Sequence, residues 1–165
     1  MAKHKEEKTN VMRILEREKI PYAAHTYAES ESPLGDREYG AHIARSLGQD
    51  ATRVYKTLAA RGASGQLYVF CIPVAESLEL KKAARAAGEK SVELLAVKEL
   101  LPLTGYVRGG CSPVGMKKRY PTFFHSAVED CGTVFVSAGR IGAQIEVEPR
   151  ALLALTGAGT ADLTA

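Results

Sequence analysis

The chain has 165 residues, of which 45% are hydrophobic and 25% are charged. These proportions are those of an ordinary globular protein and exclude a disordered or fibrous chain. The formal net charge of +3 excludes a strongly basic nucleic-acid coat, although it permits a local basic patch. Because this length suits one domain, we expect residues 1–165 to form a single domain with its core at about residues 9–157.

A short amphipathic helix is predicted near the N-terminus. Thr9 or Asn10 can cap it, the apolar residues between Val11 and Leu15 form its buried stripe, and Pro21 marks its end. After it we expect, in chain order, an extended segment at 22–27, a loop at 29–35 and a helix at 38–47 that Gly48 ends.

The middle of the chain predicts a β-hairpin. Two β-rich runs, at 53–60 and 66–72, are separated by a segment with two glycines, Gly62 and Gly65. The remaining expected elements are helices at 76–87, 97–103 and 150–155, strands at 122–125, 133–137 and 143–147, and a loose tail at 157–165. Strands in local pairs with irregularly placed helices favour an α+β fold with a mixed, barrel-like sheet flanked by helices.

Lys56 is the most informative single residue. Alternate side chains of a strand share a face, so Lys56 lies with Val54 and Leu58 on an apolar face. Lysine is rarely buried without a partner or a task, which indicates a cation that lines a pocket. A register shifted by one residue, or a lysine that extends to solvent at the strand end, explains the pattern equally well.

A glycine-rich loop at residues 109–115 is the second candidate feature. Glycines let backbone N–H groups approach a carbonyl oxygen or a phosphate closely, although a plain tight turn is the simpler interpretation. The turn at residues 137–142 allows the same two interpretations. Cys111 lies in the loop and is a tempting nucleophile, but a small residue that fills a tight space is the favoured interpretation.

The usual catalytic and metal-binding patterns are missing from the sequence. The four histidines lack metal-ligand spacing, and no nucleophile elbow is present. We therefore expect no metal and no other cofactor. The three cysteines form no C-x-x-C pair, and neither a secretory signal nor an apolar run of a membrane span's length occurs. A cytoplasmic location without membrane contact is expected.

Three ordered motifs carry a resemblance to a known family. They are Val-Tyr-Lys-Thr-Leu at 54–58, Gly-Tyr-Val-Arg-Gly-Gly-Cys-Ser-Pro-Val-Gly-Met-Lys-Lys at 105–118, and Ser-Ala-Gly-Arg at 137–140. With these motifs the chain resembles the YbaK/EbsC family over residues 11–155. The resemblance implies an α+β domain related to the editing domain of bacterial prolyl-tRNA synthetases, and hydrolysis of an aminoacyl-tRNA ester.

The resemblance also implies the site. Lys56 is the key polar residue, and no enzyme nucleophile is needed because the substrate thiol attacks its own ester. On physical grounds, Lys56 can hold either the terminal adenosine phosphate or the substrate carbonyl, and the amides of Gly109 and Gly110 can stabilise the oxyanion. The expected substrate-binding residues are Tyr27, Thr57, Ser112, Ser137, Gly139 and Gln144. Where Gln144 stands, the best-known members have an aspartate nearby, so this chain departs from the family pattern.

The implied function is deacylation of Cys-tRNA(Pro), with tRNA(Pro) and prolyl-tRNA synthetase as partners and lyase-like cyclisation as a variant of the chemistry. A synthetase cannot reject a similar or smaller amino acid by binding alone, which explains the need for editing. The sequence leaves two alternatives open: editing of another small amino acid such as alanine, and a non-catalytic module that binds tRNA or a synthetase. Weak tRNA contact is expected through Lys81, Lys82, Arg85, Lys117, Lys118 and Arg119, for which a solvated surface is the alternative.

Overall fold

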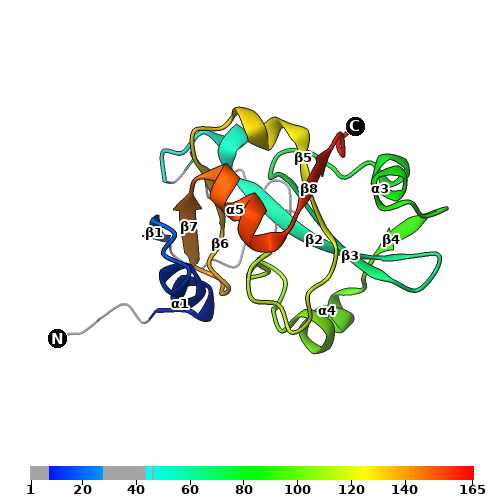
Figure 1. Cartoon of the computed structure of the whole chain (residues 1–165), viewed down its shortest axis with the longest axis horizontal. Helices are drawn as coiled ribbons and strands as arrows, with labels where there is room; N and C mark the ends of the chain where they lie inside the picture. Colours follow the sequence, from blue (N-terminus) through cyan, green and yellow to red (C-terminus); the bar gives the residue numbers. More distant parts are fainter. Residues whose placement is uncertain (1–7, 28–43, 46) are drawn as a thin grey trace.

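The computed structural model describes residues 8–27, 44–45 and 47–165. The expected loop at 29–35 lies outside these residues, as does most of the expected helix at 38–47. Figure 1 shows the described elements, whose helices are α1 (Asn10–Arg17), α3 (Leu80–Ala87), α4 (Val97–Thr104) and α5 (Pro149–Thr156). Two short 3-10 helices, η1 (Ala51–Arg53) and η2 (Ser126–Asp130), complete the helical elements that are described. No described helix is long and apolar enough to cross a membrane.

The strands form two sheets, which confirms a mixed α+β fold. The smaller sheet has the order β1-β7-β6, with β1 (Tyr22–Thr26), β6 (Val134–Ser137) and β7 (Ala143–Val147) all antiparallel. The larger sheet has the order β4-β2-β3-β5-β8, and its strands are β2 (Tyr55–Gly62), β3 (Leu67–Pro73), β4 (Val92–Leu94), β5 (Thr122–His125) and β8 (Gly159–Ala161). In it, β3–β5 and β5–β8 are parallel and the other pairs antiparallel.

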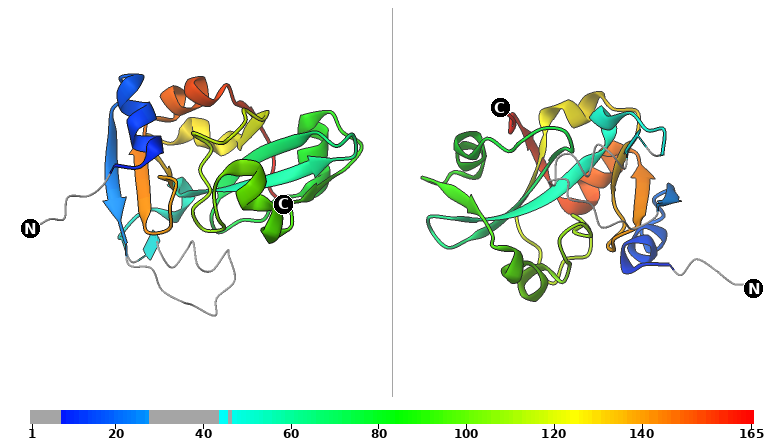
Figure 2. Two further views of the ribbon diagram at one scale, coloured as in Figure 1. Left: turned by 90° about the horizontal axis from the view of Figure 1, so that it is seen from below. Right: turned by 180° about the vertical axis from the view of Figure 1, so that it is seen from behind.

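The hairpin of β2 and β3 connects the two sheets. Its expected strands are confirmed, and Figure 2 shows the hairpin running from the small sheet out to α3 and α4. Just before β2, Val54 forms a parallel bridge with Phe135 of β6. The two sheets are therefore joined by backbone pairing at the point where β2 begins.

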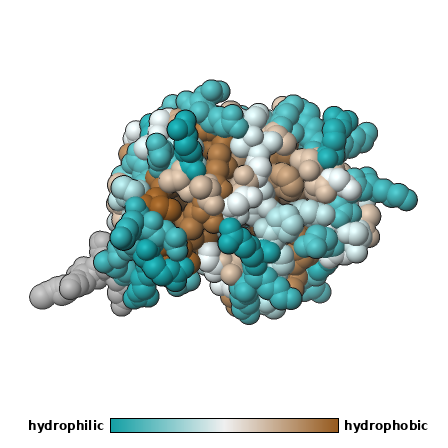
Figure 3. Space-filling view, in the orientation of Figure 1, coloured by the Kyte–Doolittle hydropathy of each residue, from teal (hydrophilic) through white to brown (hydrophobic). Residues whose placement is uncertain are grey.

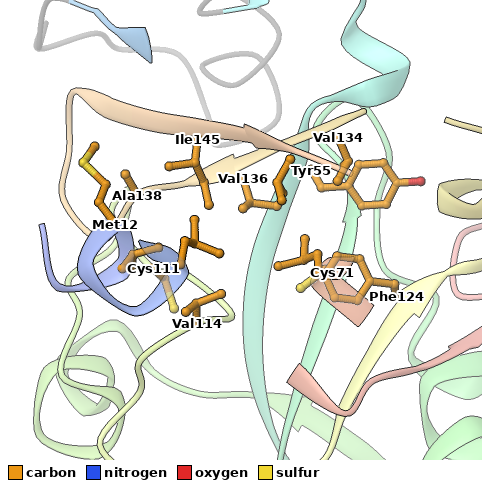
Figure 4. Close-up of a cluster of buried hydrophobic side chains, with 14 of the residues drawn as sticks. Met12, Tyr55, Cys71, Cys111, Val114, Phe124, Val134, Val136, Ala138 and Ile145 are labelled. Atoms are coloured by element: carbon orange, nitrogen blue, oxygen red, sulfur yellow. The ribbon is translucent and has the colours of Figure 1, made fainter. Parts of the chain in front are cut away.

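Most of the core lies under the small sheet. Alternate residues of β6 and β7 turn one face toward α1 and α5, as the two-residue period of a strand requires. In Figure 4, Val136 and Ile145 of this face lie above Val114 and Cys111, which belong to the glycine-rich loop. A second cluster, between β2, β3 and α3, includes Phe70, Ile72 and Leu163.

Two expectations about the elements are wrong. The helix expected from residue 76 begins at Leu80, because Glu79 caps it and the Glu79 amide donates to the carbonyl of Leu163 at 2.8 Å. The C-terminal segment is not loose: β8 pairs with β5, and the Leu163 side chain is fully buried. A three-residue strand of glycine, threonine and alanine offers no apolar alternation, so the sequence pattern hid it.

Replacing Leu163 with alanine tests the role of this segment. We expect Leu163→Ala to lower the free energy of unfolding by about 2–5 kcal/mol, because a fully buried leucine leaves a cavity. Leu80→Ala is the matched control, since Leu80 is 41% exposed and should cost far less. Denaturant unfolding measures both variants. Equal, small effects would mean that residues 157–165 are the loose tail that the sequence indicated.

Candidate functional site

The candidate site is a cavity of about 350 Å³ between the two sheets. This volume lies at the lower end of the range of small-molecule sites. Its lining comes from β2, from the ends of β1, β6 and β7, from α4 and the segment before it, and from the glycine-rich loop. The lining residues are Tyr27, Val54, Tyr55, Lys56, Thr57, Leu58, Ala59, Val74, Leu94, Leu95, Val97, Leu100, Arg108, Gly109, Cys111, Val136, Ser137 and Gln144.

Strand β2 brings Lys56 into this cavity. Lys56 pairs with Ile72 of β3 and is half-buried, two residues after the Val54 bridge. Leu58, on the same face, packs against the second core cluster, whereas the Thr57 hydroxyl lies 3.7 Å from the sulfur of Cys71 on the other face. The strand register that the sequence predicted for Lys56 is therefore observed.

The small sheet supplies a polar wall. Ser137 and Gln144 are direct partners across β6 and β7, and Tyr27 follows the end of β1. The Ser137 Oγ accepts a hydrogen bond from the Gly139 amide at 3.0 Å, and Gln144 Oε1 accepts one from Gln49 Nε2 at 2.7 Å. Both side chains are therefore held in place by neighbours that do not themselves line the cavity.

The opposite wall is apolar and partly open to solvent. Leu94 and Val97 line it and are 47% and 56% exposed, while Leu95 is buried behind them. Lys56 and Arg108 are the only charged residues that line the cavity within the described part of the chain. Cations such as these suit an anionic or hydrogen-bond-accepting group. Among the described residues, no group of histidine, cysteine or acidic side chains could hold a metal ion.

The glycine-rich loop places its residues unequally. Gly109 lines the cavity with a φ of 88°, a conformation that side chains other than glycine rarely adopt. The Gly110 amide donates to the carbonyl of Val107 at 2.9 Å, so it is not offered to a substrate as the sequence had suggested. Ser112 is fully buried, and its hydroxyl accepts from the Val114 amide at 3.3 Å.

The structure therefore divides the expected site residues into two groups. Those that line one cavity are Tyr27, Lys56, Thr57, Gly109, Ser137 and Gln144. Gly110, Ser112 and Gly139 are not among the residues that line it. Gly139 packs against Val11 and Tyr106 and supports Ser137 through its amide.

Comparisons with known proteins identify the family of this chain. Aminoacyl-tRNA editing domains match residues 39–155. The chain is 44% identical over 165 residues to the Enterococcus faecalis protein named "Putative Cys-tRNA(Pro)/Cys-tRNA(Cys) deacylase EbsC", covering 99% of this chain and 98% of that one. This chain belongs to the aminoacyl-tRNA editing domain family.

Solved structures share the fold of this editing domain. The crystal structure of hypothetical protein APE2540 superposes with a TM-score of 0.82 at 26% identity and covers 94% of this chain and 99% of that one. A crystal structure named "a putative trans-editing enzyme for prolyl tRNA synthetase" gives a TM-score of 0.77 at 27% identity and covers 94% of both chains. The family resemblance seen in the three sequence motifs is confirmed.

Two contributions to the site escaped prediction from the sequence. Arg108 belongs to the motif at 105–118, but nothing in the sequence indicates that it lines the cavity. Gln49 holds Gln144 across 95 residues of sequence, and no local pattern reports such a contact. The α4 segment was expected as a helix, but its role as the apolar wall depends on its packing.

A glycine-to-alanine pair tests how tightly the editing domain packs its loop. A Cβ at Gly110 would lie 3.0 Å from the Cα of Arg140 and from the amide nitrogen of Ile141, both of them backbone atoms. We expect Gly110→Ala to cost about 1–3 kcal/mol in unfolding free energy, because the loop must move away from the 138–142 turn. At Gly132 an added Cβ meets nothing within 4 Å, so Gly132→Ala is the control. Matching denaturation curves for the two variants would refute this packing.

Cys111 lines the cavity of the editing domain but is a poor nucleophile. Its side chain is buried, and desolvation raises the pKa of the thiol to about 12 although a hydrogen bond with Thr104 opposes the shift. The reactive thiolate is therefore scarce at neutral pH. The interpretation of Cys111 as a small residue in a tight space agrees with this environment.

Alkylation of the native protein tests whether the three cysteine thiols are accessible to a reagent. At pH 8 we expect iodoacetamide to modify Cys131, which is partly exposed, much faster than the buried Cys71 and Cys111. Burial raises the pKa of all three thiols, so exposure decides the order. Peptide mass spectrometry follows each site, and a denatured sample gives the rate without burial. Rapid native labelling of Cys111 would contradict the assignment.

Proposed function

We propose that this protein is a trans-editing deacylase that removes cysteine from Cys-tRNA(Pro). The observation that carries the proposal is a cavity that presents a strand-borne cation, Lys56, but no activated nucleophile of its own. Cys111 is protonated at neutral pH, and no histidine stands among the described lining residues to activate Thr57 or Ser137. The 44% identical relative is named for the same activity, which supports the proposal.

The substrate then supplies the attacking group. The thiolate of the bound cysteine attacks its own ester carbonyl, the ester C–O bond breaks, and the thiol proton passes to the 3′ oxygen of the tRNA. Water later opens the thiolactone, so the net reaction is hydrolysis. Lys56 favours the thiolate and the developing negative charge on the carbonyl oxygen, and the amide of Gly109 assists it.

Acceptor-stem contact through basic residues beside the loop completes the proposal. Lys117, Lys118 and Arg119 follow the glycine-rich loop and are exposed, and Arg119 donates to the carbonyl of Leu155 at 3.0 Å. Lys118 and Arg119 border a second hollow, of about 400 Å³, between α1 and the end of α5. On the face seen in Figure 3, apolar side chains gather over α5, and hydrophilic ones surround them. We propose weak, salt-sensitive tRNA binding there, aided by prolyl-tRNA synthetase in the cytoplasm.

Deacylation by the Lys56→Ala variant tests the proposal. We expect a loss of roughly 10²–10³-fold in kcat on Cys-tRNA(Pro), the scale on which removal of one stabilising group acts. Lys90→Ala, at an exposed position after α3, is the matched control and should retain full activity. Thermal unfolding of both variants shows whether the fold is kept. Full activity in Lys56→Ala would overturn the assigned role.

Substrates without a thiol separate the chemical alternatives. Ala-tRNA(Pro) and Ser-tRNA(Pro) should resist the wild-type enzyme, because alanine has no side-chain nucleophile and the serine hydroxyl is a far weaker one than a thiolate. Turnover of Ala-tRNA(Pro) without turnover of Cys-tRNA(Pro) would instead require a water nucleophile and would make this an alanine editor. Tight tRNA binding with no hydrolysis of any substrate would indicate the non-catalytic module.

A further inference from the structure

One amide pair in the polar wall has an unusual arrangement. Gln144 is 5% exposed and lines the cavity, and its Oε1 accepts a hydrogen bond from Gln49 Nε2 at 2.7 Å. No described residue accepts a hydrogen bond from the Gln144 Nε2 atom. Because the contact turns the oxygen of Gln144 toward Gln49, the N–H donors of Gln144 are the groups left for the cavity.

The orientation of both amides follows from the same contact. If both side-chain amides were flipped, Gln144 Nε2 would donate to Gln49 Oε1 and the hydrogen bond between the two residues would remain. The buried atom without a described partner would then be the Gln49 nitrogen instead of the Gln49 oxygen. In the observed arrangement the buried atom without a described partner is Gln49 Oε1. A buried carbonyl oxygen without a partner is tolerated more often than a buried N–H group, so the observed orientation is the favourable one.

Ser137 adds a second donor beside Gln144. The two residues are paired across β6 and β7, and side chains at such positions are direct neighbours. The Ser137 Oγ already accepts from the Gly139 amide at 3.0 Å, which leaves its hydroxyl proton free to point into the cavity. The wall therefore carries two adjacent neutral donors, each locked by a contact on its far side.

We propose that Ser137 and Gln144 form a subsite for the carbonyl oxygen of the aminoacyl ester, with Gln49 as the residue that positions Gln144. The inference rests on the proposed function and names the atom of the substrate that this wall binds. Neutral donors suit a carbonyl oxygen that gains negative charge during attack, and here they would act on the same oxygen as the Lys56 cation, whereas phosphate is better matched by paired cations. The subsite also replaces the Gly110 amide, which is bonded to Val107.

The substitution Gln144→Glu distinguishes this role from a structural one. Glutamate has the same shape and still accepts from Gln49, so the link between β7 and the segment at residue 49 remains, but the donors are lost. We expect kcat to fall roughly 10²-fold and KM to rise by no more than about tenfold, because the contact already exists in the ground state and strengthens as the oxyanion forms. A purely structural Gln144 would leave kcat unchanged in this variant, and that result would overturn the proposal.

Two further variants guard against misfolding and test Gln49. Gln144→Met removes the donors without adding a charge and should lower kcat similarly. Gln49→Met keeps the size of the side chain but frees Gln144 to rotate, so kcat should fall less than in Gln144→Met. If Gln49 acts only through Gln144, the double variant Gln49→Met/Gln144→Met should have the same kcat as Gln144→Met alone. Gln66→Met, in the hairpin turn where the Gln66 side chain donates to the Leu67 carbonyl, is the control. Additive losses would overturn the positioning role.

Binding of two unreactive ligands separates this inference from the proposed function. One is 3′-cysteinylamino-3′-deoxyadenosine, which keeps the carbonyl, and the other is the 3′-O ether in which CH₂ replaces C=O. Wild type should prefer the carbonyl ligand, and Gln144→Glu should reduce that preference roughly tenfold, the effect of one hydrogen bond. Calorimetric titration measures both dissociation constants.

The outcomes of these experiments are distinct. Wild-type deacylation with an unchanged ligand preference in Gln144→Glu would overturn the subsite and leave the proposed function standing. A Gln144-dependent preference without deacylation would overturn the function and keep the subsite. If wild type binds neither ligand, both are overturned.

Discussion

The fixed register of strand β2 is the constraint on which the site depends. At its start Val54 is bridged to Phe135 of the small sheet, and along its length it pairs with β3 and β4. A shift by one residue would turn Leu58 and Ala60 away from the second core cluster, so the register cannot slip cheaply. Lys56 lies within this fixed stretch, and the core therefore determines the position of the cation.

The same core governs the chemistry that the cavity can support. Burial keeps the Cys71 and Cys111 thiols protonated by raising their pKa values, which removes the enzyme's own sulfur atoms as nucleophiles. The polar side chains that remain in the cavity, on β2 and on the small sheet, include the Lys56 ammonium, the Thr57 and Ser137 hydroxyls and the Gln144 amide. Such a site suits the proposed reaction, in which the substrate attacks its own ester, and selectivity would then follow from the substrate's chemistry as well as from its fit.

The loop and turn beside the cavity act as one packed unit. Gly110 leaves room for the backbone of Arg140 and Ile141, while Gly139 lies against Tyr106, whose hydroxyl donates to the Val114 carbonyl. Through the Gly139 amide this packing reaches Ser137, and through β7 it reaches Gln144. Residues that do not line the cavity thus decide how the lining residues are oriented.

The amino-acid sequence by itself determined the α+β class, the hairpin, the face that Lys56 shares with Leu58, and the family. These depend on local periodicity and on ordered motifs, which neighbouring residues carry. Only the tertiary structure decided that β8 closes the larger sheet, that the Gly110 amide is already bonded, and that Gln49 orients Gln144. Each of these is a contact between distant segments or a choice among hydrogen-bond partners, and both are settled by packing, which a linear pattern does not encode.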